Sequence, residues 1–207
     1  MAILLKSYIC HTQKMRIALE GLIGVGKSTV LGHLKDVYHV AAEPVTSWTL
    51  LDAFYADRQR YAAPFEAQVL ASYCGPEFER PDTIMERSPD SAFHVFCKML
   101  HRDNQGLSGS HMQMLRTMYE ALPLHKADAF VYLTAPIDVC IGRLQWRNRG
   151  HEALRVQADY LIALDDAYRH FLAIFGRPYE IVALNGSEGP AQVAALVSLA
   201  CERLKAD

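Results

Sequence analysis

The stretch "EGLIGVGKST", residues 20–29, decides the fold of this chain. A glycine, four further residues and then Gly-Lys-Ser is the spacing of a phosphate-binding loop. The glycines let successive backbone N–H groups point into one concavity, and the following helix adds its positive N-terminal end. Lys27 can then reach the β- and γ-phosphates of ATP, and the Ser28 hydroxyl can bind Mg²⁺. The residues expected to bind ATP in this loop are Gly21, Leu22, Ile23, Gly24, Val25, Gly26, Lys27, Ser28 and Thr29.

The segments around this loop predict an α/β fold in which a five-stranded parallel sheet is covered by helices on both sides. Short apolar, β-prone runs predict strands at 16–20, 38–44, 83–87, 129–136 and 179–184. Helices are expected at 27–36, 47–74, 90–102 and 110–122, and another begins near Ile137. Apolar residues at helical spacing predict a further helix through Leu161, Leu164, Tyr168, Phe171 and Phe175. A last helix has Val193, Leu196, Val197 and Ala200 on one face. We expect one domain over 15–207, preceded by a flexible extension at 1–14.

Composition and charge exclude several classes of protein. The formal charge of −2 and pI of about 6.5 provide no general attraction to nucleic acid or to an anionic membrane, so neither is expected as a partner. The start "MAILLKSYIC" is broken by Lys6 and is too short for a signal peptide or a membrane span. The cysteines are scattered without a CxxC pair, which disfavours zinc and disulfides and favours the cytoplasm, the host cytoplasm if the protein is viral. They are Cys10, Cys74, Cys97, Cys140 and Cys201.

Charged residues follow the second and third predicted strands. Glu43 lies in "AAEPVTSW", and Glu86 and Arg87 lie in "MERSPDS". Because the carboxyl ends of parallel strands meet at the ligand crevice, Glu43 can accept a hydroxyl proton during attack on phosphorus. Glu86 can hold the metal, and Arg87 can pair with Glu43 and orient the acceptor. The alternatives are a solvated carboxylate beside Pro44 and a surface pair formed by Glu86 and Arg87.

Three arginines follow the fourth strand in "RLQWRNRGHE", residues 143–152. Arg143 and Arg147 are four residues apart and share a helix face, and Arg149 extends the basic patch. No carboxylate is interleaved between them, as would be usual on a solvated helix face. We therefore favour a phosphate-binding lid at about 143–153 over a solvated face.

Taken together, these segments resemble the deoxyribonucleoside kinase family, which includes the herpesviral thymidine kinases. The matching stretches also include "YLIALDDAYRHFL", and they span roughly residues 16–175 in the family's order. The resemblance implies a P-loop kinase fold, a homodimer, and transfer of the γ-phosphoryl group of ATP to the 5′-hydroxyl of a deoxyribonucleoside. Glu43 would be the base with Arg87 beside it, and Ser28 and Glu86 would serve Mg²⁺. The lid would be Arg143, Arg147 and Arg149.

The resemblance also implies a nucleoside pocket. Trp48 would form a wall of it, and Tyr55 and Glu152 would bind the sugar 3′-hydroxyl. Phe96 would stack on the base, the alternative being a place in the core. Ala92 would leave room for a 5-methyl group where deoxycytidine kinases carry Asp, which favours thymidine first and deoxycytidine second.

The residue that reads the base is ambiguous. The family uses a Gln, and aligning "YAAPFEAQ" by its Pro-Phe puts Glu66 there, whereas aligning by "AQV" puts Gln68 there. A Gln amide donates and accepts, whereas an ionised Glu only accepts and would clash with thymine O4. We therefore favour Gln68.

Two other functions stay open. A thymidylate kinase shares the loop, the sheet and the base, but its usual Asp-Arg-Tyr segment appears here as "ERS". A non-catalytic nucleotide-binding module is the other alternative. Glu43, Arg87 and the lid arginines argue against it, because simple binding needs none of them.

Overall fold

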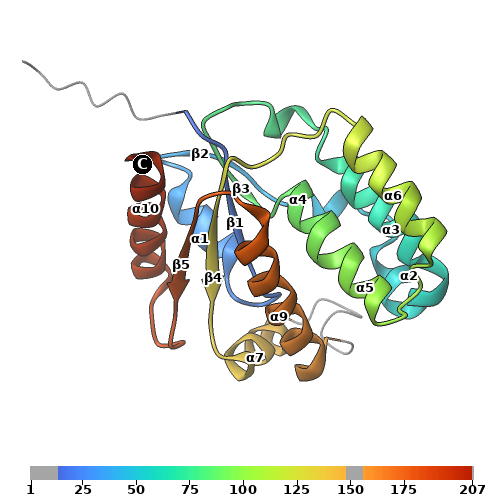
Figure 1. The fold of residues 1–207 in the computed structure, drawn as a ribbon. Helices are drawn as coiled ribbons and strands as arrows, with labels where there is room; N and C mark the ends of the chain where they lie inside the picture. The colour runs from blue at the N-terminus through green and yellow to red at the C-terminus, as the bar shows by residue number, and fades with distance from the viewer. Residues whose placement is uncertain (1–13, 148–155, 207) are drawn as a thin grey trace, which may run out of the picture.

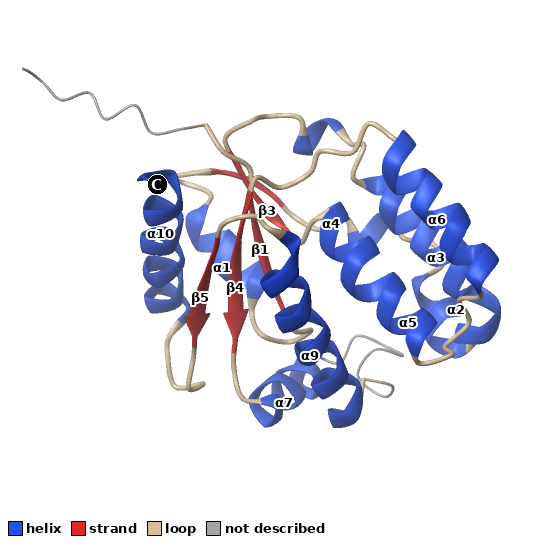
Figure 2. Ribbon diagram, in the orientation of Figure 1, coloured by secondary structure: helices blue, strands red, loops and turns tan. Residues whose placement is uncertain are grey.

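The computed structural model describes residues 14–147 and 156–206, which form a parallel sheet flanked by helices (Figure 1 and Figure 2). The strands are β1 (Ile17–Gly21), β2 (His39–Ala41), β3 (Thr83–Glu86), β4 (Ala129–Thr134) and β5 (Tyr179–Ala183). Their order in the sheet is β2-β3-β1-β4-β5, and every neighbouring pair is parallel. The predicted α/β class and five-stranded parallel sheet are confirmed.

Helices cover both faces of this sheet. They are α1 (Lys27–Leu34), η1 (Val45–Ser47), α2 (Leu51–Ala56), α3 (Arg58–Ser72), η2 (Pro76–Phe78), α4 (Pro89–Ser91), η3 (Ala92–Cys97), α5 (Lys98–Arg102), α6 (Gly109–Ala121), α7 (Ile137–Arg147), α9 (Ala158–Phe175) and α10 (Pro190–Ala206). The helices α1 and α10 pack on each other along one face. In Figure 1, α2, α3, α5 and α6 gather on the side of the molecule away from α10.

The strand register decides which side chains of β1 and β4 face α9. Glu20 of β1 aligns with Tyr132 of β4, so the two side chains lie on the same face of the sheet. The Tyr132 ring packs 5.3 Å from Tyr168 of α9, and Phe130 packs 5.2 Å from Phe171. Glu20 is therefore a fully buried carboxyl group between the central strand and α9.

Two long helical stretches are interrupted, and both interruptions correct the predicted elements. The stretch 47–74 divides at Asp57, whose extended backbone (φ −147°) separates α2 from α3 and whose side chain caps α3 by accepting from the Arg60 N–H at 3.2 Å. The stretch 90–102 contains the π-helical turn η3. Such turns occur often at functional sites because they shift the side chains that follow.

The strands β2, β3, β4 and β5 are each shorter than predicted, and the ends of β2 and β3 bear on the site. The strand β2 ends at Ala41, because Pro44 lacks an N–H and the N–H of Glu43 turns to Glu86 Oε2 (3.5 Å) instead of a neighbouring strand. The strand β3 ends at Glu86, and Arg87 adopts a left-handed backbone (φ 61°). Glu43 and Arg87 thus lie just beyond the strands, in the crevice at their carboxyl ends.

The predicted apolar face of α10 is too wide. Val193, Val197 and Ala200 are buried, but Leu196 is 39% exposed. Because α10 packs on α1 and on β5 at the edge of the sheet, only a narrow stripe of the helix is covered, and Leu196 lies on its flank.

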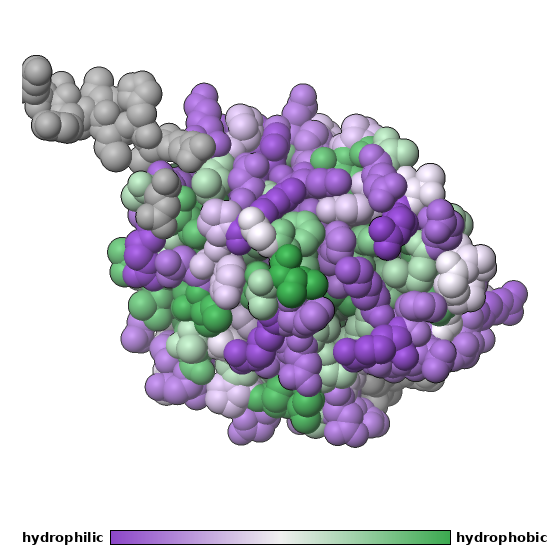
Figure 3. All heavy atoms as spheres, viewed as in Figure 1, coloured by the Kyte–Doolittle hydropathy of each residue, from purple (hydrophilic) through white to green (hydrophobic). Residues whose placement is uncertain are grey.

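The visible surface in Figure 3 is mainly hydrophilic, with small separate apolar patches. Within 14–147 and 156–206, no helix has both the length and the apolar character needed to cross a membrane.

The difference in burial between Val197 and Leu196 on α10 provides a matched pair of substitutions. We expect Val197→Ala to lower the free energy of unfolding by about 1.5–3 kcal/mol, because it leaves a cavity in place of fully buried methyl groups. Leu196→Ala should change it by less than about 0.5 kcal/mol. Urea unfolding followed by circular dichroism measures both. Equal losses would contradict the described packing of α10.

Candidate active site

The loop between β1 and α1 has the geometry of a phosphate cradle. Gly24 and Gly26 adopt positive φ angles of 85° and 111°. A Cβ added to Gly24 would come within 2.5 Å of the carbonyl oxygen of Cys140 in α7, so no larger residue fits there without displacing backbone. The loop is therefore held open against α7, with the N-terminus of α1 directed at the space a phosphate would fill.

Lys27 is held in position over this loop. It is only 5% exposed, and its Nζ donates to the carbonyl oxygens of Gly21 and Leu22, both at 3.0 Å. Burial lowers the pKa of Lys27, and the positive charge of Arg87 lowers it further, while nearby carboxylates oppose this. The ammonium group is thus presented to the cradle at a defined place, as a phosphate-binding lysine requires.

Two oxygen ligands meet beside the cradle. The Ser28 hydroxyl donates to Glu86 Oε1 at 2.7 Å. Glu86 is 5% exposed, and its other oxygen accepts from the N–H of Glu43. A hydroxyl and a carboxylate at the mouth of a phosphate loop are the hard oxygen ligands that Mg²⁺ prefers. The donor set therefore fits the metal predicted for Ser28 and Glu86.

Arg87 lies at the centre of the site. Its Nε forms an ion pair with Glu43 Oε1 at 3.1 Å, and one Nη donates to the Tyr168 hydroxyl (2.5 Å) and to the Gly21 carbonyl (3.3 Å). The guanidinium carbon lies 4.7 Å from the centre of the Phe96 ring. Burial alone lowers the pKa of Arg87, but Tyr168, Glu43 and Glu20 raise it by more. The residue thus stays charged and orients Glu43.

A second buried carboxyl group, Glu20, is linked to Arg87 through the Tyr168 hydroxyl. It accepts from the hydroxyls of Ser88 (2.6 Å) and Tyr168 (3.0 Å). Burial raises the pKa of Glu20, and hydrogen bonds from Ser88, the charge of Arg87 and further hydrogen bonds oppose the rise. Tyr168 thus bridges Glu20 and Arg87. Neither Glu20 nor Tyr168 was predicted to belong to the site; a charged residue within the apolar strand "RIALEG" was a signal for Glu20.

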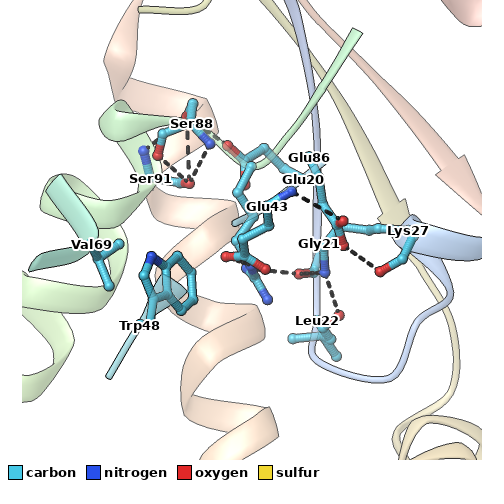
Figure 4. A network of polar contacts seen from close by, with 12 residues as sticks. Glu20, Gly21, Leu22, Lys27, Glu43, Trp48, Val69, Glu86, Ser88 and Ser91 are labelled. Atoms are coloured by element: carbon cyan, nitrogen blue, oxygen red, sulfur yellow. Dashed lines mark hydrogen bonds and ion pairs between the residues drawn. The ribbon is translucent and has the colours of Figure 1, made fainter. Parts of the chain in front are cut away.

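A cavity of about 430 Å³ runs from the cradle to an aromatic pocket. Its lining includes the loop and Lys27, Glu43 and Arg87, and residues of α2, α3 and η3. In Figure 4, Glu43 lies between the cradle residues Gly21 and Lys27 and the pocket residues Trp48 and Val69. Burial raises the pKa of Glu43, and the adjacent Arg87 charge opposes the rise. Such a carboxylate is placed and tuned to accept a proton near neutral pH.

The aromatic pocket brings together most residues predicted for nucleoside binding. Its walls are ordered by ring contacts: Trp48 meets Phe65 edge-on at 5.8 Å, and Phe65 stacks on Phe54 at 4.5 Å. The Trp48 indole N–H donates to Ser72 Oγ at 3.2 Å, which fixes the ring. The predicted residues that line the cavity are Trp48, Tyr55, Glu66, Ala92 and Phe96.

Gln68 does not lie in this pocket, so the preference for it over Glu66 was wrong. Its amide donates to Thr49 Oγ1 (3.0 Å) and accepts from the N–H of Leu50 (3.1 Å), which ties it to the turn before α2. Glu66, 2% exposed, lines the cavity instead. Two positions on a helix differ by about 200° in direction, so the two alignments lead to opposite faces of α3.

Only part of the predicted lid is described. Arg143 lines the cavity and donates to the Val25 carbonyl at 2.7 Å, which joins α7 to the cradle. The helix α7 ends at Arg147, whose side chain, with Arg149 and Glu152, lies outside the described residues. The closing lid and the sugar contact of Glu152 therefore stay predictions.

The fold and the site together define a phosphoryl-transferring protein with a P-loop and a second, acceptor pocket. A family model described as deoxynucleoside kinase matches residues 17–192. A putative kinase protein of Invertebrate iridescent virus 3 is 36% identical over 156 residues, 73% of this chain and 79% of that protein. The thymidine kinase of Ictalurid herpesvirus 1 is 34% identical over 170 residues, 75% of this chain and 73% of that protein.

A solved structure has the same fold. The deoxyadenosine kinase from M. mycoides superposes with a TM-score of 0.75 at 21% identity, covering 89% of this chain and 97% of that one. The chain belongs to the deoxynucleoside kinase family, as its motifs predicted. It is an enzyme, a phosphotransferase that acts on deoxynucleosides.

The bridge through Tyr168 makes it a positioning residue whose loss should affect turnover. In Tyr168→Phe, Glu20 and Arg87 each lose a buried partner, so we expect the free energy of unfolding to fall by about 1–3 kcal/mol. Glu43 loses part of its orientation, so kcat should fall by about one to two decades while the KM for ATP changes little. Steady-state kinetics and urea unfolding measure the two effects.

Tyr119→Phe is the matched control. The Tyr119 hydroxyl also donates to a buried carboxylate, Asp90, at 2.6 Å, and no hydrogen bond joins it to Arg87. This variant should lose stability without losing turnover. An equal fall of kcat in both variants would show that Tyr168 acts through general stability alone.

Proposed function

We propose that this enzyme transfers the γ-phosphoryl group of ATP to the 5′-hydroxyl of thymidine and, less readily, of deoxycytidine. One observation carries the proposal: a single cavity joins the phosphate cradle to an aromatic pocket, and Glu43 lies between the two ends. A nucleoside with its base in the pocket has its 5′-end toward Glu43 and the γ-phosphate.

The proposed step is an in-line transfer. The 5′-hydroxyl gives its proton to Glu43, its oxygen forms the new bond to the γ-phosphorus, and the bond from that phosphorus to the β,γ-bridging oxygen breaks, so ADP leaves with the electron pair. Arg87 keeps Glu43 oriented throughout. Ser28 and Glu86, whose side-chain oxygens lie 2.7 Å apart, would hold Mg²⁺, and the bound metal would neutralise charge on the phosphates. Lys27 and Arg143 contact the phosphates from the cradle side.

Two observations support the preference for thymidine. Ala92 is small, buried and part of the cavity wall, which leaves room for the 5-methyl group of thymine. One of the relatives is named a thymidine kinase.

The direct test is a phosphoryl-transfer assay with ATP and Mg²⁺ in which each acceptor is offered separately. The acceptors are thymidine, deoxycytidine, deoxyadenosine, deoxyguanosine and dTMP. We expect the highest kcat/KM for thymidine, the next for deoxycytidine, and little transfer to dTMP. Transfer to dTMP alone would make the protein a thymidylate kinase. ATP binding without transfer to any acceptor would make it a nucleotide-binding module.

Glu43→Gln tests the proposed base. The amide keeps the size of the side chain and an acceptor for Arg87 but cannot take a proton, so kcat should fall by two decades or more with little change in ATP binding. Glu180→Gln, at an exposed ion pair with Arg203, is the control and should keep its turnover. Near-normal kcat in Glu43→Gln would remove Glu43 from the role of base.

A further inference from the structure

Two buried polar side chains near the aromatic pocket take no part in the proposed transfer step. Glu66 and Tyr73 both line the cavity and are 2% and 0% exposed. They are seven residues apart, and Tyr73 is the C-terminal cap of α3, so two helical turns bring them to the same face of the helix. Val69, between them on that face, also lines the cavity.

Glu66 is buried without a cationic partner. In the described part of the chain it forms no ion pair with a Lys, Arg or His side chain. Its hydrogen bond is a long one, donated by the thiol of Cys97 in η3 to Oε2 at 3.5 Å. Burying a carboxylate with so little support costs far more free energy than burying a neutral carboxylic acid.

The groups facing Glu66 favour the neutral acid. Burial raises the pKa of Glu66 to about 8, the Cys97 hydrogen bond and the charge of Arg87 oppose the rise, and the charge of Glu43 adds to it. Tyr160 of α9 also interacts electrostatically with Glu66, and burial raises the pKa of Tyr160 to about 12, so its hydroxyl stays neutral. Below pH 8 Glu66 therefore carries one O–H donor and one C=O acceptor, the same pair that a Gln amide carries.

Tyr73 contributes an unused hydroxyl. Its ring packs 5.1 Å from Phe78, but its hydroxyl oxygen is buried and has no hydrogen-bond partner among the described residues. Burial raises the pKa of Tyr73 well above its usual value, and the charges of Glu43 and Glu20 add to this, so it remains a donor. A buried hydroxyl beside a cavity that is left without a partner is one that a ligand can satisfy.

We propose that the Glu66 carboxylic acid reads the base through one donor and one acceptor, and that the Tyr73 hydroxyl adds a second donor. This rests on the proposed function, which places the base at this end of the cavity. Thymine N3–H donates to the Glu66 carbonyl oxygen, and the Glu66 O–H donates to an adjacent thymine carbonyl. Tyr73 then donates to a free acceptor of the base. Cytosine fits with its amino group donating to Glu66 and its N3 accepting.

A neutral Glu66 removes the objection, raised from the sequence, that a Glu at this position would clash with thymine O4. An ionised Glu66 would present only acceptors and repel a thymine carbonyl, but the neutral acid does not. It also makes recognition of the base dependent on pH, which a Gln would not.

Glu66→Gln isolates this effect, because the amide keeps the donor and the acceptor at every pH. Deoxycytidine is the probe, since its base does not ionise between pH 6.5 and 9. Titration calorimetry should show the Kd of the unchanged protein rising about tenfold from pH 6.5 to 9, since only the neutral fraction binds. Near pH 9 its binding should take up close to one proton more than binding by Glu66→Gln does. The same pH dependence and proton uptake in both proteins would overturn the proposal.

Infrared difference spectroscopy separates this inference from the proposed function. At pH 7 the ligand-free protein should show a protonated-carboxyl band that is absent in Glu66→Gln. If the band is present and no nucleoside binds, the proposed function fails while the neutral acid stands. If the band is absent at pH 7, Glu66 is ionised and the inference fails whatever the enzyme phosphorylates.

Tyr73→Phe tests the second donor. The change removes only the hydroxyl, so thymidine affinity should fall about three- to tenfold while the free energy of unfolding stays the same or rises. Unchanged affinity with lower stability would mean that the hydroxyl is structural and would overturn its role in recognition. Tyr61→Phe, on the same helix and outside the cavity lining, is the control for loss of a tyrosine hydroxyl.

Discussion

The buried positive charge of Arg87 is the constraint on which the site depends. A guanidinium group can remain in the interior only if its charge is balanced and its N–H groups are bonded. Here Glu43 balances the charge, and the Gly21 carbonyl and the Tyr168 hydroxyl both accept hydrogen bonds from one Nη. The left-handed backbone at Arg87 turns the side chain inward from the end of β3. Segments far apart in the chain are thus joined at one residue.

Because of this arrangement, the phosphate end and the acceptor end of the cavity are positioned together. Arg87 contacts Gly21, the first residue of the cradle, and Glu43, which accepts the proton in the proposed step. Glu20 accepts a hydrogen bond from the Tyr168 hydroxyl and so fixes the position of that hydroxyl. Buried charges of this kind contribute little net stability, and their value is that they fix the geometry of reacting groups. The low dielectric around them also places the pKa of Glu43 above its usual value, as a general base requires.

Much of this could be predicted from the sequence, because the decisive residues lie at the ends of apolar strands. The spacing of Gly21 and Lys27 and the positions of Glu43 and Arg87 follow from the rule that parallel strands direct their carboxyl ends to one crevice. What could not be predicted depends on packing. The sequence indicates only that Glu20 belongs to a strand, whereas its complete burial depends on the packing of α9 over that strand.

The helical faces were the weakest part of the prediction, since a shift of two residues reverses the face that a helix presents. The choice between Glu66 and Gln68 therefore needed the structure, which places Glu66 in the cavity and ties Gln68 to Thr49. The most direct test of the whole account is a crystal structure with thymidine and a non-hydrolysable ATP analogue. We expect the 5′-hydroxyl to lie within about 3.2 Å of a Glu43 oxygen and the base to lie against Glu66. A nucleoside bound in the reverse direction, with its base toward Lys27, would contradict it.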